Sequence, residues 1–372
     1  MHFVMKNIEL FTSSIGTRRH ITVYHFGVER REPKIYLHAG LHADEPPGML
    51  VLHHLIRLLQ ERDDEPKGEI IVVPCANPIG LSQRMQGYHT GRSDLGVGGN
   101  FNRNFPDISS VLREELSLLR SEGHVLDEAA VRLALRKAVA AVVSKTELDS
   151  MKNALLGLAI DADYVVDAHC DAVGVVHAYV SDLDHPAAQL LSRNIGSVVT
   201  IGTSSVPSSS FSAGYHRSWR TARELLPDVP ITRPFAAVVE YRGQTDVRDD
   251  VAIEDARGLM GFMEAVGILK PAGKAQPKAP TLYTTAECLD YIQASVPGVI
   301  TFSKMTGEEV AVGEEIAQIL DPTTGERTSV TARSSGVIFA HTGSRVALPG
   351  TSIVSIASTS PLDRDRADPH PV

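Results

Sequence analysis

The sequence predicts an α/β domain followed by a small all-β domain. Over the first 270 residues, apolar runs typical of buried strands alternate with helical patterns, which favours helices that cover a mostly parallel sheet. A segment rich in Pro, Ala, Lys and Gly follows, and then short β segments separated by turns, as in a barrel or sandwich of two similar halves. We therefore predict a main domain at 1–270, a linker at 271–281, a β-barrel at 282–358 and a disordered tail at 359–372.

Length and composition exclude several classes of protein. The chain has 372 residues, of which 43% are hydrophobic and 22% charged, as is ordinary for a soluble protein. A net charge of −9 argues against non-specific binding to nucleic acid or anionic membranes, because both need a basic face. No signal peptide and no run of 18 apolar residues is evident. The three scattered cysteines do not suggest a disulfide framework, so we expect a reducing cytoplasm.

The first elements can be placed from their apolar patterns. Residues 7–27 predict an edge hairpin, and a strand at 34–38 follows. A helix near 47–60 can open at its proline pair, and 70–73 form a strongly apolar, buried strand. Residues 79–108 are dense in Gly, Asn and Arg and contain no clear periodic segment. A loop of this length is uncommon unless it lines a site.

The middle of the chain predicts packing helices and two more buried strands. We expect helices from Ser110 to about Ser121, after the N-cap Asp127, and from Thr146, where T-E-L-D resembles a capping box. Strands are expected at 164–166 and 234–241. Between them, the Ser-rich segment 203–223 lacks the G-x-S-x-G pattern of a nucleophile elbow, so we predict a mobile loop flanking the site.

An H-x-x-E motif follows the strand at 34–38. His42 and Glu45 lie at the carboxyl end of that strand, where open α/β sheets place their sites. Imidazole and carboxylate at this spacing can converge on one ion, and both suit Zn²⁺. About one such motif arises by chance in a chain of this composition. Taken alone, it fits equally well a surface histidine beside a glutamate that complements a helix dipole.

A second histidine follows the strand at 164–166. His169 has an acid two residues away on each side, Asp167 and Asp171, and is well placed as a third metal ligand. Read alone, it is more often a core or loop histidine. Cys170 would point away from His169 on a strand, so we interpret it as a small buried residue.

A glutamate and several arginines complete the set of candidates. Glu240 closes an apolar strand next to Arg242. It is either paired with that arginine or has its proton affinity raised for general-base work. In the long loop, Arg84, Arg92 and Arg103 are either solvated cations or guanidinium forks for a carboxylate or a developing oxyanion. Arg103, inside N-F-N-R-N-F-P, is the strongest of the three.

These candidates form a coherent constellation, because a parallel sheet brings strand ends together at one edge. Three nitrogen or oxygen ligands with an open fourth position make a catalytic zinc site. His42, Glu45 and His169 supply such ligands. A separate glutamate can then deprotonate a water that the metal activates, and an arginine can hold a substrate carboxylate or stabilise the oxyanion.

Five segments in order resemble the signature segments of the succinylglutamate desuccinylase and aspartoacylase family, relatives of the zinc carboxypeptidases. They are HAGLHADEPPG, PCANPIG, NFNRNFP, DYVVDAHC and VVEYRG, and the resemblance covers roughly residues 30–265. The resemblance implies a carboxypeptidase-like α/β fold with a mixed sheet flanked by helices. It also implies roles for individual residues: Zn²⁺ held by His42, Glu45 and His169, Glu240 as general base, Asn102 and Arg103 in contact with substrate, and Arg92 as a further anion-binding arginine. The chain departs from the family pattern at Ala43, Ala168 and Cys170 and in a helical insertion at 109–160.

The C-terminal module is similar to biotinyl and lipoyl barrels. The pattern G-x-x-V-x-x-G-x-x-I is present from Gly307 to Ile316. A carrier role would need a lysine at the tip of the central hairpin, but no lysine occurs after Lys304. We therefore interpret the barrel as structural, or as a cover near the active site.

The sequence thus predicts a zinc-dependent amidohydrolase with one Zn²⁺ per chain. It would remove the acyl group from an N-acyl amino acid or a related small carboxylate in the cytoplasm, with no nucleic-acid or membrane partner. Two alternatives stay open: a zinc carboxypeptidase for short peptides, and a non-catalytic binding protein with a vestigial metal site. A homo-oligomer is compatible with the sequence.

Overall fold

The computed structural model describes residues 1–203, 209–272 and 281–362. The chain divides into two compact units: the first consists of Met1–His169, Pro207–Val238 and Val247–Ala275, the second of Cys170–Val206, Val239–Asp246 and Gln276–Val372. Strands β7 (Tyr164–Asp171) and β11 (Phe235–Gly243) begin in the first unit and end in the second. The central part of the predicted linker and most of the predicted tail lie outside the described residues. Among described helices, none is long and apolar enough to span a bilayer.

The first unit is built on a mixed sheet. Its strands run in the order β1 (Phe3–Glu9), β2 (His20–Gly27), β4 (Glu69–Val73), β3 (Lys34–Ala39), β7 and β11. The hairpin β1–β2 and the pair β2–β4 are antiparallel, whereas β3 pairs in parallel with both β4 and β7. All residues of β3 and β4 are buried, which explains their unbroken apolar runs. The predicted edge hairpin and the predicted strand at 70–73 are confirmed.

Two strands are longer than the sequence indicates. β7 extends to Asp171 and β11 to Gly243, so His169 and Glu240 lie within strands and not just after or at the end of them. The prediction that the strand beginning at Tyr164 ends at residue 166 is therefore wrong. The reason is that polar residues of β7 are themselves buried and paired: Asp167 and His169 are at most 3% exposed.

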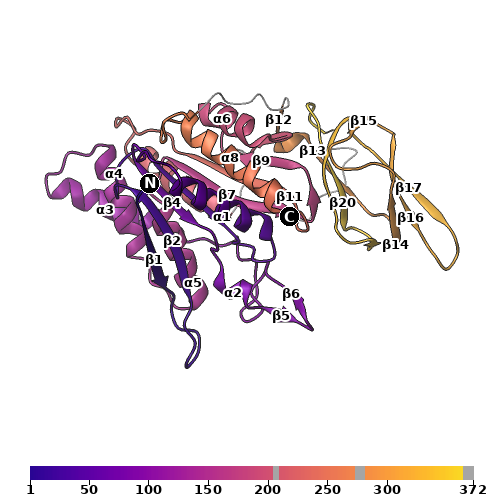
Figure 1. The fold of residues 1–372 in the computed structure, drawn as a ribbon, viewed down its shortest axis with the longest axis horizontal. Helices are drawn as coiled ribbons and strands as arrows, with labels where there is room; N and C mark the ends of the chain where they lie inside the picture. The colour runs from indigo at the N-terminus through magenta and orange to yellow at the C-terminus, as the bar shows by residue number, and fades with distance from the viewer. Residues whose placement is uncertain (204–208, 273–280, 363–372) are drawn as a thin grey trace. The chain divides into compact units, whose positions relative to one another are not determined.

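Helices pack against this sheet and extend its core. α1 (Pro46–Gln60) contacts β3, β4 and α8 (Asp249–Ala265), and α5 (Glu147–Ala159) contacts β3. Helices α3 (Ser109–Ser121), α4 (Glu128–Ala140) and α5 form the predicted insertion (Figure 1). Asp127 caps α4 and Thr146 opens α5 with a capping box, so these predictions are confirmed. Their buried leucines belong to the same apolar cluster as Tyr36 of β3.

One predicted loop is a helix. Residues Phe211–Leu225 form α7, and Ser210 caps it by accepting a hydrogen bond from the backbone N–H of Ala213. Phe211, Tyr215 and Trp219 recur every four residues and bury one face of α7, which is the helical period. The mobile-loop prediction for 203–223 is therefore wrong for residues 211–223, because the serines obscured this spacing. Residues 204–208 of the segment lie outside the described residues.

The long segment at 79–108 has little regular structure. It contains a single short helix, α2 (Pro78–Leu81), and a two-stranded ribbon of β5 (Arg84–Met85) and β6 (Tyr88–His89). Its course is fixed instead by side chains. Asn77 caps α2 and also donates to the Leu41 carbonyl at 2.8 Å, which ties this segment to the turn after β3.

The second unit contains a parallel strand layer and two small antiparallel sheets. β9 (Val176–Val180), β10 (Val199–Gly202) and β12 (Leu282–Thr285) are parallel neighbours, with α6 (Pro186–Ile195) against β9. The two sheets run β13-β20-β18-β15 and β17-β16-β14-β19. Their strands are β13 (Leu289–Gln293), β14 (Gly298–Phe302), β15 (Glu309–Val310), β16 (Glu315–Leu320), β17 (Arg327–Thr331), β18 (Gly336–His341), β19 (Val346–Ala347) and β20 (Ser352–Ala357). The predicted fold class, mixed α/β with a small C-terminal all-β part, is confirmed.

Candidate metal centre

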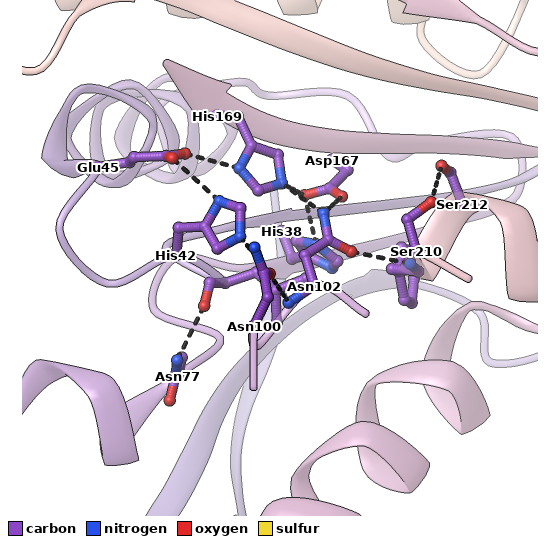
Figure 2. Close-up of polar contacts among 12 residues, drawn as sticks. His38, His42, Glu45, Asn77, Asn100, Asn102, Asp167, His169, Ser210 and Ser212 are labelled. Atoms are coloured by element: carbon purple, nitrogen blue, oxygen red, sulfur yellow. Dashed lines mark hydrogen bonds and ion pairs between the residues drawn. The ribbon is translucent and has the colours of Figure 1, made fainter. Parts of the chain in front are cut away.

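His42, Glu45 and His169 meet in the first unit. All three are buried, and one ligand atom from each lies within 4.8 Å of the others. The Nδ1 atom of His42 is 3.0 Å from Glu45 Oε1, and the Nδ1 atom of His169 is 2.7 Å from Glu45 Oε2. Figure 2 shows both imidazoles turned toward the same carboxylate. The sequence prediction that these three side chains can share one ion therefore agrees with their geometry.

His42 and Glu45 lie in a turn that is fixed by backbone contacts. Gly40 follows β3 in the left-handed region, with φ 70°, which suits glycine. The Ala43 amide then donates to the Gly91 carbonyl at 2.9 Å. A Cβ atom on Gly91 would lie 2.3 Å from the Asp44 nitrogen, so only glycine permits this approach. Glu45 ends the turn as the residue before α1, which Pro46 and Pro47 open.

The outward nitrogens of both imidazoles also have partners. His42 Nε2 lies 2.8 Å from Asn100 Oδ1, and His169 Nε2 lies 2.8 Å from Asp167 Oδ1. An oxygen acceptor at Nε2 selects the tautomer with its proton there, which leaves the Nδ1 lone pair free for a metal. The donor set and its orientation therefore fit a divalent ion such as Zn²⁺.

Opposite charges reinforce one another inside this cluster. Burial alone would raise the pKa of Glu45, but the attraction and hydrogen bonds of His169 and then His42 outweigh it and lower the pKa to about 2. Burial likewise opposes the charge on His169, yet Asp167 and Glu45 raise its pKa well above the ordinary value. The carboxylates of Glu45 and Asp167 therefore stabilise positive charge at this site, as the carboxylates of a metal-binding site do.

Arg92 reaches the cluster from the long loop. Its Nη1 atom lies 2.9 Å from Glu45 Oε1 and 3.4 Å from His42 Nδ1, and its side chain is 58% exposed. Arg84, in contrast, donates to the carbonyls of Leu81 and Gln83 at 3.0 and 2.8 Å. The structure therefore brings Arg92 to the cluster and gives Arg84 a local role at the end of α2.

Arg103 is exposed and lies near enough to Arg92 to be affected by its charge. Its Nη1 atom donates to the Asn102 carbonyl at 2.9 Å. Partial burial, and then the positive charge of Arg92, lower the pKa of the Arg103 guanidinium. Among the ion pairs of the described residues, Arg103 has no acidic partner. Two neighbouring cations, one without a protein carboxylate, suit an anionic ligand.

Asn102 is held entirely by protein groups. Its Oδ1 atom accepts the backbone N–H of Phe211 at 2.8 Å, and its Nδ2 atom lies 3.4 Å from Asp167 Oδ2 and 3.1 Å from His169 Nε2. The residue is 5% exposed. Asn102, which the resemblance implies contacts substrate, therefore contacts His169, a candidate metal ligand, and Asp167, the residue paired with that ligand.

Glu240 belongs to the second unit, whereas the three candidate ligands belong to the first. It lies on β11 and is half-buried. Within its own unit, the charge of Glu240 is one of the smaller causes that raise the pKa of Tyr179, after burial of that hydroxyl. Its role as general base is taken from the resemblance and stays a proposal.

A second group of acids, Glu32, Glu128 and Asp163, could also approach one ion. Arg132 already occupies its centre: the guanidinium lies 2.9 Å from Glu32, 2.6 Å from Glu128 and 2.6 Å from Asp163. Arg132 therefore already pairs with all three carboxylates of this group, and the histidine-containing cluster is the candidate metal centre.

Sequence reasoning missed the residues behind the ligands. Asn100 and His38 lie 58 and 129 residues from their partners His42 and Asp167, so no local pattern reveals them. Asp167 is the exception: the sequence already places this acid two residues before His169, and residues two apart on a strand point to the same face. The D-x-H pattern of β7 therefore places a carboxylate beside the imidazole.

The sequence model of the succinylglutamate desuccinylase/aspartoacylase catalytic domain matches residues 31–225. The chain belongs to this family. The matched range includes the three candidate ligands and Arg103, and it ends before Glu240. The family is one of deacylases, so the chain is assigned to the hydrolases. No curated protein matches the chain significantly.

Solved structures share the fold across nearly the whole chain. A family protein from Shewanella amazonensis is 23% identical with a TM-score of 0.81, covering 95% of this chain and 98% of its own. A second, from Shewanella frigidimarina, is 22% identical with a TM-score of 0.81, over 97% and 99% of the two chains. A product-bound ectoine utilization protein from Ruegeria pomeroyi is 18% identical with a TM-score of 0.65, over 96% and 95%. At these identities the likeness concerns the fold alone.

Proposed function

We propose that the chain is a zinc-dependent deacylase that hydrolyses the amide bond of an N-acyl amino acid or a related small carboxylate. The observation that supports this most is the convergence of His42, Glu45 and His169, whose ligand atoms lie within 4.8 Å of one another. Two imidazole nitrogens and a carboxylate are the ligands of many catalytic zinc sites. When bound there, zinc supplies a Lewis acid that polarises a carbonyl and makes water more acidic.

The arginines give this site a preference for anions. Arg103 and Arg92 are neighbouring cations, and Arg92 already contacts Glu45 at 2.9 Å. A guanidinium fork binds a carboxylate through two parallel hydrogen bonds. We assign these two residues to the carboxylate of the substrate or to the oxyanion that develops on its carbonyl. Asn102 would contact substrate through the same loop, or would position that loop.

Glu240 is assigned to proton transfer. Its carboxylate would accept a proton from the water that attacks the amide carbon. As the C–N bond breaks, Glu240 would return that proton to the leaving nitrogen, so that the products are a carboxylic acid and an amine. Glu240 is half-buried on β11, a strand whose other residues are mostly buried.

The three cysteines, Cys75, Cys170 and Cys288, form no disulfide in the described part of the chain. Disulfides form and persist mainly in oxidising compartments. We therefore infer that the protein works in the cytoplasm, as expected from the sequence.

A panel of N-acetyl, N-succinyl and N-formyl amino acids tests the function directly. Deacylation should be detected for at least one member, should stop on chelation and should return with zinc. Glu240→Gln should lower kcat by about 10²- to 10⁴-fold, while the zinc content measured by elemental analysis stays at one per chain.

Three results would contradict the proposal or one of its assignments. If Glu240→Gln keeps its activity, the assignment of Glu240 is wrong. If no acyl amino acid is cleaved but short peptides lose C-terminal residues, the carboxypeptidase alternative holds. Absence of stoichiometric zinc together with tight binding of an acyl amino acid would favour a binding protein.

A further inference from the structure

A buried hydrogen-bonded chain lies behind His169. Asp167 is 0% exposed, and its Oδ1 atom is 2.8 Å from His169 Nε2 and 2.7 Å from His38 Nε2. One carboxylate oxygen thus faces two imidazoles, as Figure 2 shows. His38 is also 0% exposed and touches none of the three candidate ligands through a described hydrogen bond.

The sheet register creates this arrangement. His38 of β3 is the cross-strand partner of Asp167 of β7 in a parallel pair. Paired residues lie on the same face of a sheet, and so do residues two apart on one strand. His38, Asp167 and His169 therefore share one face. The ring of Phe211 packs against His38 with ring centroids 4.5 Å apart, which excludes water from that side.

Hydrogen-bond directions along the chain are fixed by what each group can donate. Asp167 as a carboxylate only accepts, so both imidazoles donate from Nε2. His38 Nδ1 must then accept, and its partner at 3.0 Å is the Tyr36 hydroxyl. On the other oxygen, Asn102 Nδ2 donates to Asp167 Oδ2 at 3.4 Å. The ion pairs of Asp167 within the described chain are with the two histidines alone.

We propose that Asp167, oriented by His38 and Asn102, is the positioning carboxylate of the metal centre. It holds His169 in the tautomer and ring orientation that direct Nδ1 toward the ion. A carboxylate behind a metal-binding imidazole fixes its tautomer and raises its basicity, and loss of such a partner weakens metal binding about 10- to 100-fold. His38 acts indirectly, because it contacts Asp167 and not the candidate metal ligand His169. This inference rests on the proposed zinc site.

Zinc affinity, measured by competition with a chelator, is the test. Asp167→Asn keeps the size of the side chain but puts an amide where the carboxylate stood, so zinc should bind about 10- to 100-fold more weakly. The visible spectrum of the cobalt-substituted protein should shift as well, because the His169 ring is no longer fixed. A role in stability alone would change neither the affinity nor the spectrum.

His38 variants separate orientation from packing. His38→Phe preserves an aromatic ring against Phe211 but removes the donor to Asp167, and it should weaken zinc binding by about tenfold. His38→Gln retains a donor and should restore most of the loss. Equal zinc affinities for His38→Phe, His38→Gln and the unaltered chain would overturn the role of His38 even if Asp167→Asn does not fold.

The chain offers a matched control in another histidine–carboxylate pair, in which the glutamate is buried. His25 Nε2 lies 2.8 Å from Glu69 Oε1, and Glu69 is 2% exposed. Neither residue contacts a candidate ligand in the described structure. Glu69→Gln should lower the melting temperature and leave zinc affinity within about twofold. If Glu69→Gln weakens zinc binding as much as Asp167→Asn, the effect is general destabilisation and the inference is wrong.

The measurements also distinguish this inference from the function on which it rests. If the unaltered chain holds no zinc, the proposed metal site fails. If the unaltered chain binds zinc and Asp167→Asn binds it equally well with the same cobalt spectrum, the metal site stands and only the positioning role of Asp167 is excluded.

Discussion

At the scale of single residues, Arg103 and Arg84 differ in what surrounds them. Arg103 has a cation, Arg92, as its neighbour, whereas Arg84 donates only to carbonyls at the end of α2. We predict that Arg103→Ala lowers kcat/KM for the acyl amino acid by about 10²-fold, mainly through KM, because a charged hydrogen bond to the substrate is lost. Steady-state kinetics on the substrate found in the panel measure this.

Two variants serve as controls for that prediction. Arg103→Lys should recover only part of the loss, because an ammonium is a point charge and lacks the guanidinium fork. Arg84→Ala should leave kcat/KM unchanged within about twofold, since it removes only local contacts. An Arg84→Ala variant as impaired as Arg103→Ala would show that the loop as a whole, and not the Arg103 charge, is responsible.

The buried His177 should make the stability of the protein depend on pH. It is 0% exposed, and burial lowers its pKa to about 4. An unfolded histidine binds a proton near pH 6.5, so between about pH 6.5 and pH 4 the unfolded chain holds more protons than the folded one. The contribution of His177 to the free energy of unfolding should therefore decrease as the pH is lowered through this window, by at most about 1.4 kcal/mol per pH unit.

Urea unfolding at pH 7.5 and pH 5.0 measures this dependence. His177→Phe cannot titrate and should lose less stability between the two pH values than the unaltered chain, whatever its stability at pH 7.5. Equal losses for the two proteins would show that His177 is protonated in the folded state.

Residue types at the metal centre could be predicted from the sequence, but their supporting partners could not. His42 and Glu45 are three apart, and His169 is flanked by acids, so the chemistry of each was visible locally. Asn100 and His38 depend on register between segments distant along the chain. No periodicity in the sequence encodes that register, and tertiary structure alone supplies it.

At the scale of elements, two helix glycines have opposite roles. A Cβ atom on Gly48 of α1 would lie 3.0 Å from the Ala168 Cβ and 3.2 Å from the Ala39 Cβ, so α1 can approach β3 and β7 this closely only because the side chain is absent. On Gly157 of α5 it would lie 3.5 Å from Val139 Cγ1, which is ordinary contact. The same substitution should therefore destabilise one helix and stabilise the other.

We predict that Gly48→Ala lowers the free energy of unfolding by about 1–3 kcal/mol through overpacking. It should also weaken zinc binding, since Glu45 directly precedes α1. Gly157→Ala should raise the free energy of unfolding by about 0.5–1 kcal/mol, because glycine is a poor helix former. Urea denaturation measures both, and a stabilising Gly48→Ala would refute the tight packing of α1.

The elements that the sequence predicts well are those with a clear apolar pattern and a capping residue. The capping box at Thr146 and the N-cap at Asp127 located α5 and α4 correctly. The failures have physical causes. Helix α7 was hidden by the serines before its apolar face, and β7 continues through Asp167 and His169 because their polar groups are paired inside the protein.

At the scale of the whole molecule, the C-terminal strands complete the second unit. β8 (Val173–Gly174) pairs with β18, and β10 pairs along its full length with β12. Residues of β8 follow His169 by only four and five positions. The C-terminal sheet that contains β18 is therefore bound by backbone hydrogen bonds to β8, which follows the third candidate ligand. This favours a structural role for the C-terminal strands.

Truncation after residue 272 tests this role. Removing β12 and β18 would leave β10 and β8 without these backbone partners, and an unpaired buried strand promotes aggregation. We predict that the truncated chain is largely insoluble, or is soluble with less than stoichiometric zinc, as measured by size-exclusion chromatography and elemental analysis. A monomeric truncated chain with full zinc content and activity would mean that the barrel is an independent module.

Crystals of the full chain grown with zinc, measured on both sides of the zinc absorption edge, test the central claim most directly. One anomalous peak per chain should lie about 2.0–2.2 Å from the Nδ1 atoms of His42 and His169 and from a carboxylate oxygen of Glu45. A peak at other residues, or no peak between these three in an active protein, would contradict the account.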